Sequence, residues 1–167
     1  LGDVYKRQVI VWQHLRVKIK GDEYVSIHRA KDRLMHENDV IEMILDEKLD
    51  DVKAALPTED RERLAQFETD FWHGVSMTVQ VWHNINQTMH VLFGQDRKAF
   101  ALSKESQNME QALRGAIFRA WDTTQFDWLG AVREAIRKSL STQARTHAAR
   151  ALWGGAQWHY GAPMGDE

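Results

Sequence analysis

A long heptad pattern is the feature of this sequence that most constrains its fold. The positions that would face a partner helix, here called the seam, recur three and four residues apart. They are Phe71, Val75, Thr78, Trp82, Ile85, Met89 and Leu92. This spacing is typical of a helix that packs along a partner helix. Pro57 and Thr58 precede the pattern as a start signal, and Gly94 follows it as a stop signal. We predict one helix from Glu59 to about Phe93, close to 50 Å long at about 1.5 Å per residue.

The preceding residues predict another helix and a short hairpin. From about Ala30, one helical stripe consists of Leu34, Ile41, Leu45, Leu49, Val52 and Leu56. Pro57 ends this helix because proline lacks an N–H donor and disfavours helix in the residue before it. Residues 15–20 alternate apolar and basic side chains, which indicates a strand. Gly21 then begins a turn before residues 24–27, so we predict a β-hairpin there.

The residues after Gly94 predict two more helices and a tail. One helix begins at Arg97 or Ser103 and runs to about Trp121, and the next carries the stripe Leu129, Val132, Ile136 and Leu140. Repeated glycine predicts a flexible tail over residues 154–167. The fold class is therefore mostly α: a bundle of about four helices with a short N-terminal β-hairpin, in a single domain over residues 9–153.

The first residues have a different explanation. Residues 3–8 read DVYKRQ, which is the translation of GATGTGTATAAGAGACAG, a transposase adapter used in sequencing libraries. We interpret residues 1–8 as a sequencing-adapter artefact and expect the native N-terminus to be missing. These residues are therefore excluded from the fold prediction.

Composition excludes several classes of chemistry. The chain has no cysteine, which removes disulfides, thiolate metal sites and thiol nucleophiles, and favours a reducing compartment. No apolar run approaches the roughly 20 residues that span a bilayer, and no signal-peptide pattern opens the chain. Glycine-rich phosphate loops, H-E-x-x-H and G-x-S-x-G are absent. We expect a cytoplasmic protein without a cofactor and without a membrane partner.

The charge is unevenly divided along the chain. Residues 21–70 contain fifteen acidic and seven basic residues, a net charge of −8, whereas residues 94–153 contain six and ten, a net charge of +4. A basic half favours an anionic partner, although charged faces also simply solvate helices. We predict nucleic-acid contacts by Arg97, Lys98, Arg114, Arg119, Arg133, Arg137, Lys138, Arg145 and Arg150. Guanidinium and ammonium groups match phosphate oxygens, and each neutralised phosphate releases counterions.

Histidines provide the remaining candidate chemistry. His83, Gln87 and His90 share one side of the long helix, so two imidazoles could face one metal. That helix offers no carboxylate near them, and we interpret them as structural histidines and predict no metal site. Arg29 and His36 have six residues between them, a spacing that resembles the Arg-x(4–6)-His catalytic pair of HEPN-type ribonucleases, with Ala30 where a polar residue usually follows the arginine. This resemblance implies RNA cleavage as an alternative function.

The basic half also resembles a known family. The matching segments are Asp96, Arg97, Lys98 and Phe100; then Leu113, Arg114, Gly115, Ala116 and Ile117; then Phe126, Asp127 and Trp128; then Arg145, Arg150, Leu152 and Trp153. Residues 96–153 resemble the C-terminal half of the small subunit of type I CRISPR Cascade complexes. The resemblance implies a helical, non-catalytic protein that lines a ribonucleoprotein and holds RNA or single-stranded DNA.

Three functions follow from these patterns. The first is a non-enzymatic structural or binding subunit that contacts a nucleic-acid backbone through its basic C-terminal helices and assembles with protein partners or with itself through the heptad seam. The second is an oligomerising helical scaffold or phage-type structural protein with no nucleic-acid role. The third is a HEPN-like ribonuclease.

Overall fold

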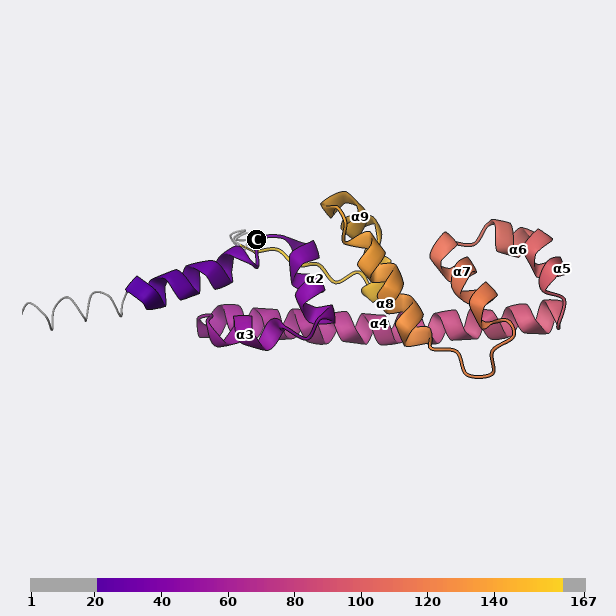
Figure 1. The fold of residues 1–167 in the computed structure, drawn as a ribbon, viewed down its shortest axis with the longest axis horizontal. Helices are drawn as coiled ribbons and strands as arrows, with labels where there is room; N and C mark the ends of the chain where they lie inside the picture. Colours follow the sequence, from indigo (N-terminus) through magenta and orange to yellow (C-terminus); the bar gives the residue numbers. More distant parts are fainter. Residues whose placement is uncertain (1–20, 161–167) are drawn as a thin grey trace, which may run out of the picture. The chain divides into compact units, whose positions relative to one another are not determined.

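The computed structural model describes residues 21–160, which are mostly helical and contain no β-strand (Figure 1). Residues 21–32 are helical. The following elements are α2 (Glu37–Leu45), α3 (Leu49–Ala54), α4 (Thr58–Phe93), α5 (Arg97–Leu102), α6 (Lys104–Gln107), α7 (Gln111–Ala120), α8 (Trp128–Ser139), α9 (Gln143–Ala148) and the 3-10 helix η1 (Arg150–Trp153). The predicted mostly α class is confirmed.

The predicted β-hairpin is wrong in its second strand. Residues 24–27 are helical, whereas the first predicted strand, residues 15–20, lies outside the described residues. Residues 24–27 are too few to distinguish the period of a strand from that of a helix. Over a longer window, the partly buried Ile27 and the buried Ala30 and Leu34 lie three and four residues apart, which is a helical spacing.

The chain packs as two compact units. The first contains residues 21–64 together with residues 159–160, and the second contains Ala65–Trp158. Helix α4 begins in the first unit and continues in the second. Within residues 21–160, no helix combines the length and apolar character needed to cross a bilayer.

In the first unit, the single helix predicted up to Leu56 is wrong, although its apolar stripe is buried as expected. Leu34, Ile41, Leu45, Leu49, Val52 and Leu56 are all at most 3% exposed. Glu47 interrupts the helix with a left-handed φ of 57°. The N–H of Lys48 donates to the carbonyl of Met43 at 2.9 Å, and the N–H of Glu47 donates to Ile44 at 3.2 Å. This pattern closes the C-terminus of α2 before α3 begins.

The corner between α3 and α4 forms as the Pro57 signal predicts. The carbonyl of Pro57 accepts from the N–H of Arg61 at 3.0 Å, so α4 begins at Thr58, one residue before the expected Glu59. The guanidinium of Arg61 donates to the carbonyls of Lys53 at 3.1 Å and Leu56 at 3.0 Å. These bonds tie the start of α4 to the end of α3, where the carbonyl of Lys53 also accepts from the N–H of Leu56 at 3.1 Å. The long helix itself is confirmed, ending at Phe93.

In the second unit, the heptad seam of α4 packs against other parts of the same chain. Phe71, Val75, Trp82 and Met89 are buried. The indole of Trp153, in η1, lies 5.7 Å from the ring of Phe71. Trp128, at the start of α8, lies 6.1 Å from the ring of His83 in α4. The seam is therefore covered within the unit as far as Met89, whereas Leu92, which was also predicted to lie in the seam, is 57% exposed.

The third predicted helix is divided into α5, α6 and α7. Asp96 caps α5 by accepting from the N–H of Ala99 at 2.9 Å, and Ser103 caps α6 by accepting from the N–H of Ser106 at 3.1 Å. Ser103 has extended backbone angles, which a continuous helix excludes. These short helices enclose Phe100, whose buried ring lies 5.1 Å from that of Trp121.

Candidate nucleic-acid interface

A groove of about 730 Å³ lies between α7, α8 and α9 in the second unit. Small side chains form much of its lining, namely Ala112, Gly115, Ala131, Ala135, Ala148 and Ala149. Its charged lining residues are Glu110, Arg119, Glu134, Lys138 and Arg145. The groove therefore combines charged groups with a lining that leaves room for an extended ligand.

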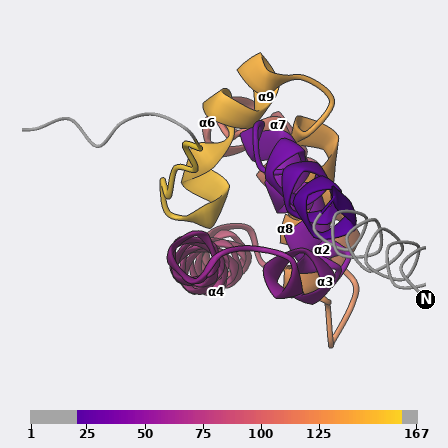
Figure 2. The same ribbon diagram turned by 90° about the vertical axis from the view of Figure 1, so that its left-hand side faces the viewer.

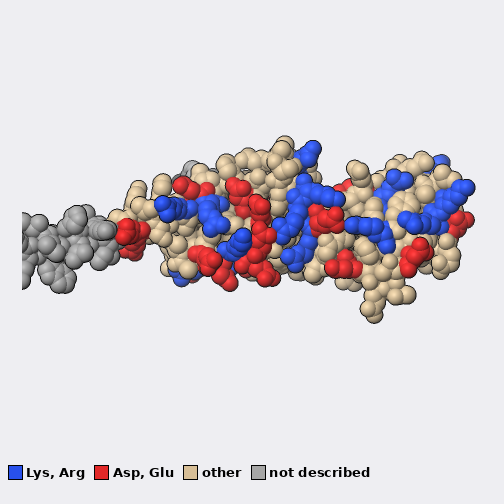
Figure 3. Space-filling view, in the orientation of Figure 1, with Lys and Arg blue, Asp and Glu red and all other residues tan. Residues whose placement is uncertain are grey.

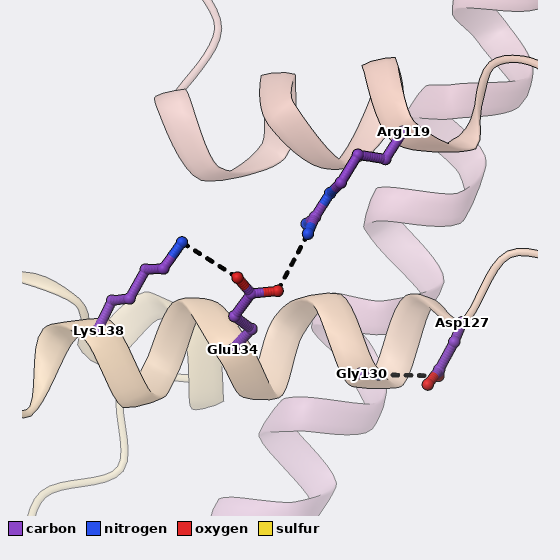
Figure 4. Close-up of polar contacts among 5 residues, drawn as sticks. All are labelled: Arg119, Asp127, Gly130, Glu134 and Lys138. Atoms are coloured by element: carbon purple, nitrogen blue, oxygen red, sulfur yellow. Dashed lines mark hydrogen bonds and ion pairs between the residues drawn. The ribbon is translucent and has the colours of Figure 1, made fainter.

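An ion-pair network across α7 and α8 organises this groove (Figure 4). One carboxylate oxygen of Glu134 accepts from the guanidinium of Arg119 at 3.0 Å, and the other is 3.1 Å from Nζ of Lys138. Glu134 and Lys138 are one helical turn apart, and Arg119 reaches over from α7. The side chains are 47% to 75% exposed, so each pair contributes little to stability. The network places two cations and one carboxylate beside the groove.

Glu134 remains ionised more readily than an ordinary glutamate. The hydrogen bond from Arg119 lowers the pKa of this carboxyl most strongly, and the hydrogen bond from Lys138 lowers it further. Both donors favour the charged form of the group that accepts from them. At neutral pH the network thus carries two positive charges and one negative charge.

A second hollow of about 340 Å³ adjoins Glu134 on α8. Arg133 and Arg137 line it together with Asp127, Leu129 and Gly130, and Glu134 lines both hollows. Asp127 caps α8 by accepting from the N–H of Gly130 at 2.8 Å (Figure 4). This cap fixes the start of α8 and thereby the direction in which its basic residues project. Arg133 also lies over the ring of Trp72, 5.7 Å from the ring centre.

The structure thus brings five of the nine predicted cations to two neighbouring hollows. Arg119, Lys138 and Arg145 line the first, and Arg133 and Arg137 line the second. Basic side chains are visible over this part of the second unit in Figure 3, with acidic side chains among them.

Comparisons with family models, curated proteins and solved structures return no match for this chain.

Four predicted cations lie elsewhere in the second unit. Arg97 and Arg114 both lie over the ring of Phe118, at 5.5 and 5.3 Å from its centre. The Nε of Arg114 also donates to the hydroxyl of the buried Ser106 at 2.8 Å, so Arg114 has a structural role. Lys98, which is exposed on α5, and Arg150 in η1 line neither hollow.

The histidine candidates have aromatic neighbours. His90 lies 4.3 Å from the ring of Trp121, and His83 lies against Trp128. Among residues 21–160, no three His, Cys, Asp or Glu side chains are arranged to hold a metal ion. Arg29 and His36, the pair of the ribonuclease alternative, are both exposed in the first unit.

Sequence reasoning missed the acidic members of the site. Glu134 was not among the predicted residues, and Glu110 lines the first groove as well. A signal for one contact was present, because Glu134 and Lys138 are four residues apart in a helical segment. The contact from Arg119 joins residues fifteen positions apart, and no local periodicity indicates it.

Proposed function

We propose that the chain is a non-enzymatic binding subunit whose second unit holds the backbone of a nucleic acid along the face formed by α7, α8 and α9. The observation that carries this proposal is the meeting of five cations from three helices at two hollows that share Glu134. Three carboxylates, Glu110, Asp127 and Glu134, line the same hollows. The positive charge therefore exceeds the negative charge at this face.

The geometry of the cations suits a chain of phosphates. Arg119 and Lys138 lie on either side of Glu134, and their side chains are 52% and 75% exposed, so a phosphate has access to both. Arg145 is exposed in α9, where its guanidinium donates to the hydroxyl of Ser141 at 3.2 Å. Guanidinium forks bind phosphate oxygens in pairs. The alanines of the groove leave space for the sugars between successive phosphates.

A salt-dependent binding experiment tests this proposal. Fluorescence anisotropy with labelled single-stranded RNA and DNA should give an affinity that falls steeply with salt, by a log–log slope of about −0.7 for each phosphate contact on a single strand. Arg137→Glu combined with Arg145→Glu should weaken binding at least tenfold and make the slope shallower. Lys48→Glu combined with Lys104→Glu changes the net charge equally but lies outside both hollows.

The outcomes distinguish binding at the proposed face from binding that depends only on the net charge of the chain. Retention of most of the affinity by the Lys48 and Lys104 variant supports the proposed face. Equal losses in the two double variants would show that only net charge matters and would overturn the assignment. Absence of binding by the wild-type chain at about 50 mM salt, where such contacts are strong, would exclude a backbone-binding function.

A further inference from the structure

One face of α4 is uncovered within the second unit. Viewed nearly along α4, the other elements of this unit lie to one side of it (Figure 2). On its exposed face, Met77 is 57% exposed, Val81 50% and Val91 85%. Asn84 and Thr88 are exposed between them. These five positions are four, three, four and three residues apart, so they form a second heptad stripe, distinct from the seam that the unit buries.

This stripe lies in a long segment without charge. Residues 71–95 contain no Asp, Glu, Lys or Arg, although 28% of the whole chain is charged. A helix face that remains in water normally carries charged side chains. Here the exposed side chains beside the apolar positions are Ser76, Gln80, His83 and Gln87. The composition of this face is therefore that of a contact surface.

We propose that this face binds the same face of a second copy of the chain, with the two α4 helices antiparallel and a two-fold axis close to Asn84. The stripe is nearly symmetric about that residue. Met77 and Val91 are each seven residues from Asn84, and Val81 and Thr88 are three and four residues from it. An antiparallel pair therefore places Met77 against Val91 and the two Asn84 amides against each other. Such a self-complementary patch is what a two-fold interface requires.

The chemistry of the face favours a copy of itself over other occupants. A helix that lies on a membrane carries Lys or Arg on its polar face, and phosphate binding also needs cations, whereas residues 71–95 have neither. A charged protein surface would lose hydration here without gaining an opposite charge. Two faces without such charges avoid that cost, and facing asparagine amides can hydrogen-bond to each other. Because residues 77–91 span only about 21 Å, we expect a micromolar rather than a nanomolar dimer.

Single cysteines test the register, because the chain has no cysteine of its own. Asn84→Cys should be cross-linked to its own copy by a short bis-maleimide. Met77→Cys and Val91→Cys should each cross-link poorly alone but efficiently when the two variants are mixed. Strong cross-linking of Met77→Cys to itself would indicate a parallel pair and overturn the proposed arrangement.

A charge test measures the energetics of the same contact. Asn84→Lys places like charges opposite each other at the axis and should raise the dimer dissociation constant at least tenfold in sedimentation equilibrium, with an unchanged helical circular dichroism spectrum. Leu102→Lys adds the same charge at a 69% exposed apolar residue of α5 and should leave the dimer intact. A wild-type chain that is monomeric at all concentrations up to about 1 mM, far above a micromolar dissociation constant, or a dimer that Asn84→Lys does not weaken, would overturn the proposal. These assays contain no nucleic acid, so their result is independent of the proposed function.

Discussion

Substitution of Gly74 by alanine should destabilise the second unit, although the same change normally stabilises a helix. Gly74 lies within α4 where η1 crosses it, and a methyl group there would overlap the backbone carbonyl of Trp153. It would also lie 2.7 Å from the backbone nitrogen of Gly154. Both obstacles are backbone atoms, and Trp153 is fully buried. The conflict can therefore be relieved only by moving η1 and the indole that fills the core beside Phe71.

The magnitude follows from two opposing effects. Alanine is about 1 kcal/mol more favourable than glycine inside a helix. Overpacking commonly costs about 1–3 kcal/mol, and we expect about 3 kcal/mol here because no flexible side chain can yield. Gly74→Ala should therefore lower the free energy of unfolding by about 2 kcal/mol. Gly115→Ala in α7 is the matched control, because a methyl there has no neighbour within 4 Å, and it should raise stability by up to about 1 kcal/mol.

Urea unfolding followed by tryptophan fluorescence measures this difference. Six of the seven tryptophans lie in residues 65–158, so the signal reports chiefly on the second unit. Thermal midpoints should move in opposite directions for the two variants, by about 2–4 °C for each kcal/mol in a chain of this size. A Gly74→Ala variant as stable as Gly115→Ala would refute the close approach of η1 to α4.

Two further predictions concern Glu47 and Glu134. Glu47→Gly should stabilise the first unit by about 0.5–1 kcal/mol in urea unfolding, because glycine relieves the left-handed strain at φ 57°; Glu47→Ala keeps that strain and should give no such gain. Because Arg119 and then Lys138 lower the pKa of Glu134 below its ordinary value of 4.5, its carboxylate stabilises the folded chain at neutral pH, and this contribution is lost as the pH falls through that lowered pKa. Wild type and Glu134→Gln should therefore differ slightly in stability at pH 7 and converge as the pH falls through that lowered pKa, and a difference that persists in acid would contradict the assigned hydrogen bonds.

The sequence predicted α4 well because its signals are long and mutually consistent. The seam residues Phe71, Val75, Trp82 and Met89 are buried as expected, and Pro57 and Gly94 bound the helix. A period sustained over 36 residues outweighs local exceptions such as Gly74. That glycine allows the backbone of η1 to approach α4 closely.

The breaks in the other helices were less predictable, because they depend on backbone conformation at single residues. Glu47 adopts a left-handed φ that favours glycine, so the residue type there gives no warning. Ser103 interrupts the third predicted helix by capping α6, and serine is also compatible with a helix interior. At Glu47 the apolar stripe continues across the break, so its period predicts burial correctly but wrongly predicts one continuous helix. Ser103 was one of the two starts expected for the third helix.

In the candidate site too, some features are predictable from neighbouring residues in the sequence, whereas others depend on how the helices pack. Residue type indicated which side chains could meet phosphates, and Arg133 and Arg137, four residues apart in α8, line one hollow. Whether Arg119 joins them depends on how α7 packs beside α8, which is decided by buried residues such as Ile117 and Ile136. The carboxylate of Glu134 then determines how much of that positive charge is available. Glu134→Gln removes this negative charge, so it should strengthen phosphate binding by about as much as the loss of a single arginine weakens it.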